Sequence, residues 1–448
     1  MKAIFDRYRN IASSIWSTFV SLAARRDVTR LMTESSMHHP GWRVVIACFA
    51  MTFFGFGYGF YGHSVYLAAL TIRDGSDAPR IAVSTVSTAV TVYYLTAAAI
   101  MVLISDLVAR LGPRLFAAIG AVMMGVSLFL IARIRTVFDL FVAYLAMAPA
   151  FAMLTNAAVA NIVGLWFTKK RGLAMSVALT GGGVGGFAIV PTLVWLSSKL
   201  SFPIALEVIA AATIPILLMA IALCIRLPAW EEAKPAAPVG GQGPRTQPVT
   251  RRQALASVHY WTIAAPLMLA IMVQVGFVVH QVSFLLPVLG QEGAGVAVFV
   301  TALMAATSRV VVGFFIDRLD QRTVGALLLA AQTSALFAML KFPSPHVAYL
   351  ASAVFGFAVG VMITLPALII QRECPPAAFG MLSGLTLAII QTGNAFGPSL
   401  LGWLRDATGS YAVPIIACIA LEISALAIIV LRIGPPKDVA PNGNGRLP

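Results

Sequence analysis

Residues 296–316 read VAVFVTALMAATSRVVVGFFI, an apolar run long enough to cross a bilayer as a helix and interrupted by one charge, at Arg309. An arginine stays ionised at any physiological pH, and at the centre of a membrane helix it costs about 2.5–3.5 kcal/mol on insertion scales. Such a residue is expected to face a water-filled cavity or an anionic ligand. Arg309 is therefore the first candidate for a substrate-binding residue.

The whole chain is unusually apolar. Of its 448 residues, 59% are hydrophobic and only 11% are charged, which is outside the range of soluble domains. The composition predicts an all-α membrane protein of the cell membrane. Twelve apolar segments are long enough to be transmembrane helices, at about 43–70, 81–105, 115–134, 138–167, 173–198, 202–226, 259–289, 294–316, 324–342, 346–371, 379–404 and 411–433.

Lysine and arginine are distributed unevenly over the loops between these segments. If the N-terminus is cytoplasmic, the inner side carries 23 of the 31 basic residues and the outer side carries seven. This asymmetry is the positive-inside pattern, and it predicts that both termini are cytoplasmic. The net charge of +14 is thus explained by topology and the lipid bilayer, without a nucleic-acid partner. The four cysteines form no CxxC or Cys/His pattern, so neither a disulfide framework nor a metal site is expected. No cofactor is expected either.

One long polar stretch, 227–258, is rich in proline and glycine and is predicted to be a cytoplasmic linker. It divides the chain into six segments on either side. The predicted organisation is an N-terminal cytoplasmic segment, a six-helix bundle, the linker, a second six-helix bundle and a cytoplasmic tail, at 1–40, 41–226, 227–258, 259–433 and 434–448. The N-terminal segment can be either an amphipathic helix on the membrane surface or a mobile tail.

The two halves repeat at a shift of 208 residues. The shift places Arg110–Arg114 on Arg318–Arg322, and it aligns Gly172 with Gly380, Gly185 with Gly393 and Trp195 with Trp403. A parallel repeat of six helices resembles the plan of the major facilitator superfamily. That resemblance implies a substrate site near the membrane midplane between the halves, and transport by rocking one half against the other.

Two inner loops resemble the signature loop of that superfamily, Gly-x-x-x-Asp-Arg-x-Gly-x-Arg. The first has Ala109 where the acid is expected, with Asp106 one turn earlier; the second keeps its acid but has Asp320 in place of the glycine. The resemblance implies a charge latch on the cytoplasmic side, although these charges could serve topology alone. The residues assigned to these gating loops are Asp106, Arg110, Gly112, Arg114, Asp317, Arg318 and Arg322.

Further motifs narrow the resemblance. Gly41-Trp42-Arg43 opens the first segment, and the stretch 166–174, WFTKKRGLA, introduces the fifth. Both are similar to the monocarboxylate transporter family and its bacterial oxalate/formate-antiporter-like relatives. In that family an arginine of the eighth helix pairs with the substrate carboxylate, which implies this role for Arg309.

The sequence also departs from the family. An aspartate expected one turn before the arginine is replaced by Ala305. A lysine of the eleventh helix in the oxalate-type relatives has no counterpart, since that helix offers only Gln391 and Asn394. A single fixed positive charge suits a monoanion better than a dianion.

Several other polar residues lie inside apolar segments, where each could instead form an interhelical hydrogen bond worth about 0.6 kcal/mol. Besides Arg309, the residues predicted to bind substrate are His280, Gln281, Asn156, Tyr93, Gln391 and His63. The candidates for carrying a proton are His280, His63 and Glu422.

The sequence therefore predicts a secondary transporter of a small monocarboxylate, coupled to a proton or to a counter-anion. One alternative is a carrier or exporter of a neutral or hydrophobic compound, in which Arg309 is structural. Another is a transporter-like sensor without flux. An enzyme is not expected, because the sequence contains no nucleophile–base pair, metal-ligand set or phosphate loop. The oligomeric state is left open, and a monomer would suffice.

Overall fold

The computed structural model describes residues 39–71, 81–167, 170–225, 250–313, 315–374 and 378–431. The predicted N-terminal segment up to residue 38, the linker up to residue 249 and the tail from residue 432 lie outside the described residues. The end of the predicted linker, residues 251–256, forms a short helix.

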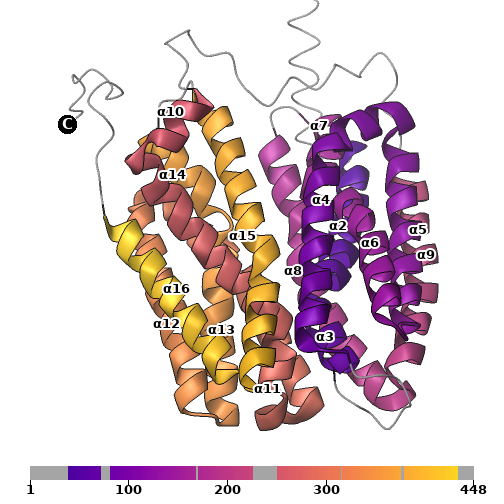
Figure 1. Cartoon of the computed structure of the whole chain (residues 1–448). Helices are drawn as coiled ribbons and strands as arrows, with labels where there is room; N and C mark the ends of the chain where they lie inside the picture. Colours follow the sequence, from indigo (N-terminus) through magenta and orange to yellow (C-terminus); the bar gives the residue numbers. More distant parts are fainter. Residues whose placement is uncertain are drawn as a thin grey trace, which may run out of the picture.

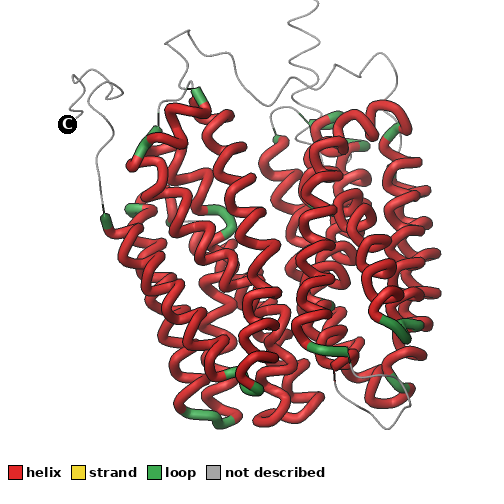
Figure 2. The backbone as a smooth tube through the Cα atoms, in the orientation of Figure 1, coloured by secondary structure: helices red, strands yellow, loops and turns green. Residues whose placement is uncertain are grey.

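The described chain is almost entirely helical (Figure 2). The first half comprises α2 (Gly41–Phe56), the π-helix η1 (Gly57–Tyr61), α3 (His63–Thr71), α4 (Val83–Leu111), α5 (Pro113–Ala132), α6 (Val137–Leu154), α7 (Asn156–Gly164), α8 (Arg171–Leu200) and α9 (Phe202–Cys224). The second half comprises α10 (Arg251–Ala256), α11 (Val258–Gly313), the 3₁₀-helix η3 (Ile316–Arg318), α12 (Gln321–Lys341), α13 (Pro345–Met362), α14 (Leu365–Glu373), α15 (Phe379–Thr408) and α16 (Ala412–Val430).

Ten stretches among the described residues are long and apolar enough to cross a membrane. One of them, Val258–Arg309, is 52 residues long, far more than the roughly 20 residues that a crossing requires. It bends at Gly290, whose φ of 68° lies in the left-handed region that glycine tolerates. This bend divides α11 into two arms and separates the predicted segments 259–289 and 294–316. Helix α15 is 30 residues long but is not one of the ten apolar stretches.

The helices form two groups that lie side by side (Figure 1). Helices α2–α9 form one group and α10–α16 the other; we call them the N-half and the C-half. Helix α10 and the last turn of α16, where the described part of the chain ends, lie toward the upper side of Figure 1, and we call this end of the molecule the terminus end. The opposite end, where α3 ends and α15 approaches α4, is called the far end.

Close approach of helices inside the N-half depends on the glycines at the middle of α8. A Cβ atom on Gly185 would collide with the backbone carbonyl of Phe53 in α2, and a Cβ atom on Gly181 would collide with that of Phe49. Small residues permit such backbone contact between membrane helices. These glycines bring α2 and η1 against α8, next to the C-half.

Besides the first segment, which contains η1 and a turn at Gly62, two predicted continuous segments are broken in the structure, at positions that the shift of 208 residues aligns. The segment 138–167 is interrupted at Thr155, between α6 and α7, and the segment 346–371 is interrupted at Ile363 and Thr364, between α13 and α14. The shift of 208 residues places Thr155 on Ile363. Pro366 contributes to the second break, because it lacks an N–H group and its ring would clash with the preceding helical turn.

Candidate functional site

Arg309 lies on the second arm of α11, beside the break between α13 and α14. Its Nε–H donates to the carbonyl oxygen of Gly360 at 3.2 Å, in the last turn of α13. The break frees carbonyl groups at this helix end, and a cation is favourable there. Among the described residues, Nη1 and Nη2 of the half-buried Arg309 have no hydrogen-bond partner and no carboxylate within 4.0 Å. One edge of the guanidinium is thus held by the protein, and its terminal amino groups remain available.

The same region of α11 contacts the N-half. A Cβ atom added to Gly186 of α8 would lie 2.5 Å from the ring of Tyr61 and 3.0 Å from the Cβ atom of Ala302. Ala302 precedes Arg309 by about two helical turns. Tyr61 ends the π-helix η1 and interacts electrostatically with Arg309. A short π-helical segment inside a membrane helix often marks a functional site. Among the described residues, the one cation of the second arm therefore lies in the region where α11 packs against η1 and α8 of the opposite half.

Hydrogen bonds between the halves gather at the far end. Among the described residues they join α4 of the N-half to α11 and α15 of the C-half. Ser84 N donates to Asp406 Oδ2 at 2.6 Å, and Thr91 Oγ1 donates to the Ala395 carbonyl at 2.6 Å and lies 2.6 Å from Ser399 Oγ. Toward the terminus end, the described residues form no hydrogen bond between the halves. Among the described residues, the hydrogen bonds between the halves are therefore confined to one end, whereas α8 and α11 also pack against each other closer to Arg309.

His280 belongs to this far-end contact. Its Nε2 lies 3.2 Å from Ser87 Oγ of the N-half and 3.0 Å from the Pro398 carbonyl oxygen, and its Nδ1 lies 3.1 Å from Tyr411 Oη. The side chain is 1% exposed. The sequence predicted His280 as a partner of Arg309 in the substrate pocket. The structure places it instead in the contact between α4, α11 and α15 at the far end, which we call the seam between the halves.

His63 is enclosed within the N-half by four tyrosines. The ring centroids of Tyr93, Tyr144, Tyr94 and Tyr66 lie 4.8, 5.4, 5.8 and 5.9 Å from that of His63, and Tyr144 is stacked on it. Tyr93 Oη donates to the Gly59 carbonyl at 2.6 Å. Neither ring nitrogen of His63 has a partner among the described residues, nor do the hydroxyls of the other three tyrosines. The sequence singled out His63 and Tyr93. The enclosure of His63 by the four tyrosines, which we call the aromatic box, is a tertiary feature built from α3, α4 and α6.

The other predicted residues are spread through the molecule. Gln281 is buried in the C-half, where Nε2 donates to Thr301 Oγ1 at 2.8 Å and to Ser352 Oγ at 3.2 Å. Asn156 is exposed at the start of α7, and Gln391 is half-buried on α15, where it accepts from Asn394 at 3.3 Å.

Glu422 is fully buried between α16 and α12. Thr333 Oγ1 donates to its Oε2 at 3.1 Å, and its Oε1 has no partner among the described residues. It lies among helices of the C-half, away from the far-end contact described above. The structure therefore brings Arg309 together with Tyr61, and does not gather the remaining predicted residues around it.

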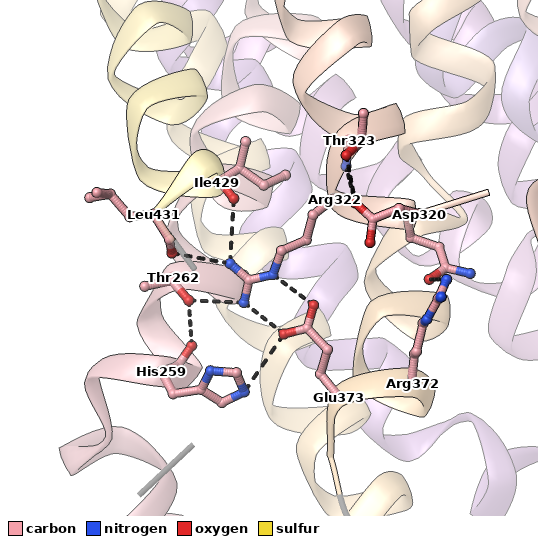
Figure 3. Close-up of polar contacts among 10 residues, drawn as sticks. His259, Thr262, Asp320, Arg322, Thr323, Arg372, Glu373, Ile429 and Leu431 are labelled. Atoms are coloured by element: carbon pink, nitrogen blue, oxygen red, sulfur yellow. Dashed lines mark hydrogen bonds and ion pairs between the residues drawn. The ribbon is translucent and has the colours of Figure 1, made fainter. Parts of the chain in front are cut away.

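A charge cluster lies at the terminus end of the C-half (Figure 3). The buried Arg322 forms a bidentate ion pair with Glu373, in which Nε donates to Oε1 at 2.7 Å and Nη2 donates to Oε2 at 2.8 Å. Arg322 is only 4% exposed. It also donates to Thr262 Oγ1 at 3.0 Å and to the Ile429 and Leu431 carbonyls at 3.4 Å. Arg322 thus connects α11, α12, α14 and the end of α16. The sequence predicted Arg322 but missed Glu373, whose only signal was its position at the end of an apolar segment.

The remaining gating-loop residues are arranged differently. Asp106, Arg110, Arg114 and Arg318 are exposed, and the side chain of Asp317 is not described. Gly112 adopts a φ of 75° at the junction of α4 and α5, a conformation that favours glycine. In the repeat, Arg322 corresponds to Arg114, but Glu373 corresponds to Leu165. The N-half therefore cannot build the same ion pair.

The fold defines a multi-pass helical membrane protein with two packed halves, and comparison with known proteins gives its family. A family model described as the Major Facilitator Superfamily matches residues 44–398, with a second match over 294–447. The chain belongs to this superfamily of transporters. It is accordingly a membrane-embedded protein that handles a small-molecule substrate.

This chain is similar to several known transporters at low sequence identity. Monocarboxylate transporter 13 of Rattus norvegicus is 25% identical over 334 residues, which cover 73% of this chain and 74% of that one. The agnestins efflux protein AgnL12 of Paecilomyces divaricatus is 24% identical over 336 residues, 72% of each chain. These two relatives differ in the kind of transport that their names describe.

Solved structures share the fold. An inward-facing, occupied bacterial homologue of the human lysosomal transporter Spinster aligns with a TM-score of 0.69 at 15% identity, over 89% of this chain and 97% of that one. The nucleoside transporter NupG aligns with a TM-score of 0.65 at 14% identity, over 87% and 98%. At this identity the likeness concerns the fold alone.

Proposed function

We propose that the chain is a secondary active transporter of a small monocarboxylate, working by alternating access with proton symport or anion exchange. The observation that carries the proposal is Arg309. Its Nε–H is occupied by Gly360, whereas its terminal amino groups have no partner among the described residues. Two parallel N–H groups match the two oxygens of one carboxylate. The monocarboxylate transporters among the relatives support this substrate class.

The topology is part of the proposal. With both arms of α11 and α15 crossing the membrane, the chain has twelve transmembrane helices, and the basic loops place the terminus end in the cytoplasm. The far-end contacts then close the outer side, and the structure corresponds to an inward-facing state. The two halves are the rocking units, residues 41–226 and 259–433.

Arg309 would hold the carboxylate, and Tyr61, facing it from the N-half, would contact the same ligand. Asn156, Gln391, Tyr93, Gln281, His280 and His63 are kept as further candidates for the substrate pathway. The proton candidates remain His63, His280 and Glu422, all buried in this state. The gating-loop residues are proposed to stabilise the cytoplasmic side in the alternate state.

Counterflow in proteoliposomes tests the substrate class. Vesicles preloaded with unlabelled pyruvate or lactate should accumulate the labelled compound, and Arg309→Gln should abolish this while the variant remains folded in the membrane. Uptake by Arg309→Gln at the wild-type rate would refute the assigned role. A pH gradient without internal anion separates symport from exchange: symport drives net uptake, and exchange does not.

Efflux of a neutral or hydrophobic compound is the second candidate, favoured by the efflux proteins among the relatives. In that case Arg309 serves only to cap α13. Thermal-shift screening of purified protein distinguishes the two, since carboxylates should stabilise the wild type and not Arg309→Gln. Stabilisation of both proteins by neutral compounds alone would support the efflux function.

A further inference from the structure

We propose that His280 is a proton-sensitive latch of the outer gate: the neutral ring holds the halves together, and a proton from the outer solution favours the outward-facing state. The inference rests on the proposed topology and on alternating access, and not on the identity of the substrate.

His280 bridges the seam that must open. Its ring contacts Ser87 on α4 of the N-half, and Pro398 and Tyr411 of the C-half, with distances of 3.2, 3.0 and 3.1 Å. Among the described residues it is the only histidine that contacts both halves through hydrogen bonds. Opening the far end separates α4 from α11 and α15, and therefore changes the surroundings of this ring. A group whose surroundings differ between two states can bias the equilibrium between them.

The contacts of the ring define its protonation in the closed seam. The Pro398 carbonyl oxygen can only accept, so Nε2 must carry a hydrogen. Nδ1 can then accept the hydroxyl hydrogen of Tyr411. The neutral imidazole thus satisfies both nitrogens, and this assignment follows from the bonding pattern.

A second proton would place a positive charge in a seam that is nearly closed to solvent. Two of the groups packed against the ring are hydroxyls. Ser87 of α4 does not titrate, and Tyr411, just before α16, contacts Nδ1. α15 presents Arg405, which repels a positive charge, and Asp406, which attracts one. Asp406 already accepts from Ser84 N and pairs with Arg405 at 3.0 Å.

Helix α11 itself carries Glu292 at this end, and it also packs against α8 and α13, whose far ends carry Lys199, His346 and Tyr349. The last neighbour of α11 at the far end is α3. It carries His63 and Tyr66, which belong to the aromatic box of the N-half. No carboxylate among the described residues lies within 4.0 Å of the His280 ring nitrogens. The closed seam therefore favours the neutral form, because an unpaired buried charge is costly.

Opening the seam would hydrate the ring, and a hydrated imidazole binds a proton near pH 6.5. Protons would then bind preferentially to the outward-facing state. By linkage, the ratio of outward-facing to inward-facing molecules should rise about tenfold between pH 7.5 and pH 5.5.

The test measures conformation and requires no substrate. Spin labels on Lys199→Cys and Lys341→Cys, exposed at the far ends of α8 and α12, report the distance between the halves. The pair is introduced into a variant without the four native cysteines and reconstituted in nanodiscs. Double electron–electron resonance at pH 7.5 and pH 5.5 should show a longer distance gaining population in acid. His280→Gln, which keeps a neutral donor and acceptor, should show the same distribution at both pH values.

His346→Gln is the matched control, because His346 is an exposed histidine at the same end of the molecule, at the start of α13. It should retain the full acid response. The proposal is overturned if His280→Gln responds to acid as the wild type does, or if acid fails to lengthen the distance in the wild type. Neither result depends on carboxylate counterflow, so failure of this inference and failure of the proposed substrate class can be told apart.

Discussion

Arg309 and Gly360 are joined by a hydrogen bond of 3.2 Å from Nε–H to a backbone carbonyl, at the place where helix α13 ends inside the bundle. The bond stabilises a helix end and orients a guanidinium at the same time. Its repeat-related counterparts in the N-half are Met101 and Ala152, which cannot form it. The break between α6 and α7 is served instead by Thr155, whose Oγ1 donates to the Phe151 carbonyl at 2.7 Å.

The first prediction concerns the shape of the cation. Arg309→Lys keeps the charge but cannot bond Gly360 and also present two parallel N–H groups, so the apparent KM for the carboxylate should rise at least about tenfold. Counterflow at varied substrate concentration measures this. Arg133→Ala is the control, because Arg133 forms an exposed pair with Glu207 at 3.0 Å and should matter little. An unchanged KM in Arg309→Lys would show that only charge is required.

The second prediction concerns the buried ion pair of the C-half. Arg322→Met leaves Glu373 without its main partner and should destabilise the protein by about 3 kcal/mol. The double variant Arg322→Met/Glu373→Met should regain part of this loss, because no uncompensated charge remains. Thermal unfolding in detergent measures both. Arg318→Met, an exposed arginine nearby, should change stability little, and equal losses in Arg318→Met and Arg322→Met would contradict the pairing.

The third prediction concerns helix packing in the N-half. Gly185→Ala places a methyl group against the Phe53 carbonyl and should cost about 1–3 kcal/mol through overpacking. Gly384→Ala, also inside a helix but with open space around it, should be neutral or slightly stabilising. The difference between their melting temperatures is the measurement. Similar values for the two variants would show that α2 and α8 can separate without cost.

The fourth prediction concerns the far-end contact. Asp406→Ala removes the acceptor of Ser84 N and should shift the equilibrium toward the outward-facing state by roughly tenfold, since a hydrogen bond to a charged group contributes about 1.5–3 kcal/mol. The spin-label pair on the far ends of α8 and α12 reports the shift. Asp139→Ala, which removes a carboxylate that caps α6 within the N-half, should leave the distance unchanged. An identical response of the two variants would rule out a specific contribution of the Ser84–Asp406 bond.

The sequence by itself determined that the chain is a helical membrane protein. Apolar runs of about 20 residues can satisfy their backbone groups in a membrane only as helices, and among the described residues ten helical stretches are long and apolar enough to cross one. It also singled out Arg309, because one charge in an apolar run is conspicuous without any knowledge of its neighbours.

Only the tertiary structure decided which polar residues meet. His280 and Arg309 lie on the same α11 helix, yet His280 bonds across the far-end contact between the halves and Arg309 bonds to Gly360, because the turn at Gly290 separates the two arms. Glu373 and the tyrosines around His63 belong to segments distant in sequence, and a hydropathy pattern contains no information on which faces come together. The helix breaks at Thr155 and Ile363 were missed for a related reason: composition sets the length of an apolar segment and does not show where its backbone hydrogen bonds are interrupted.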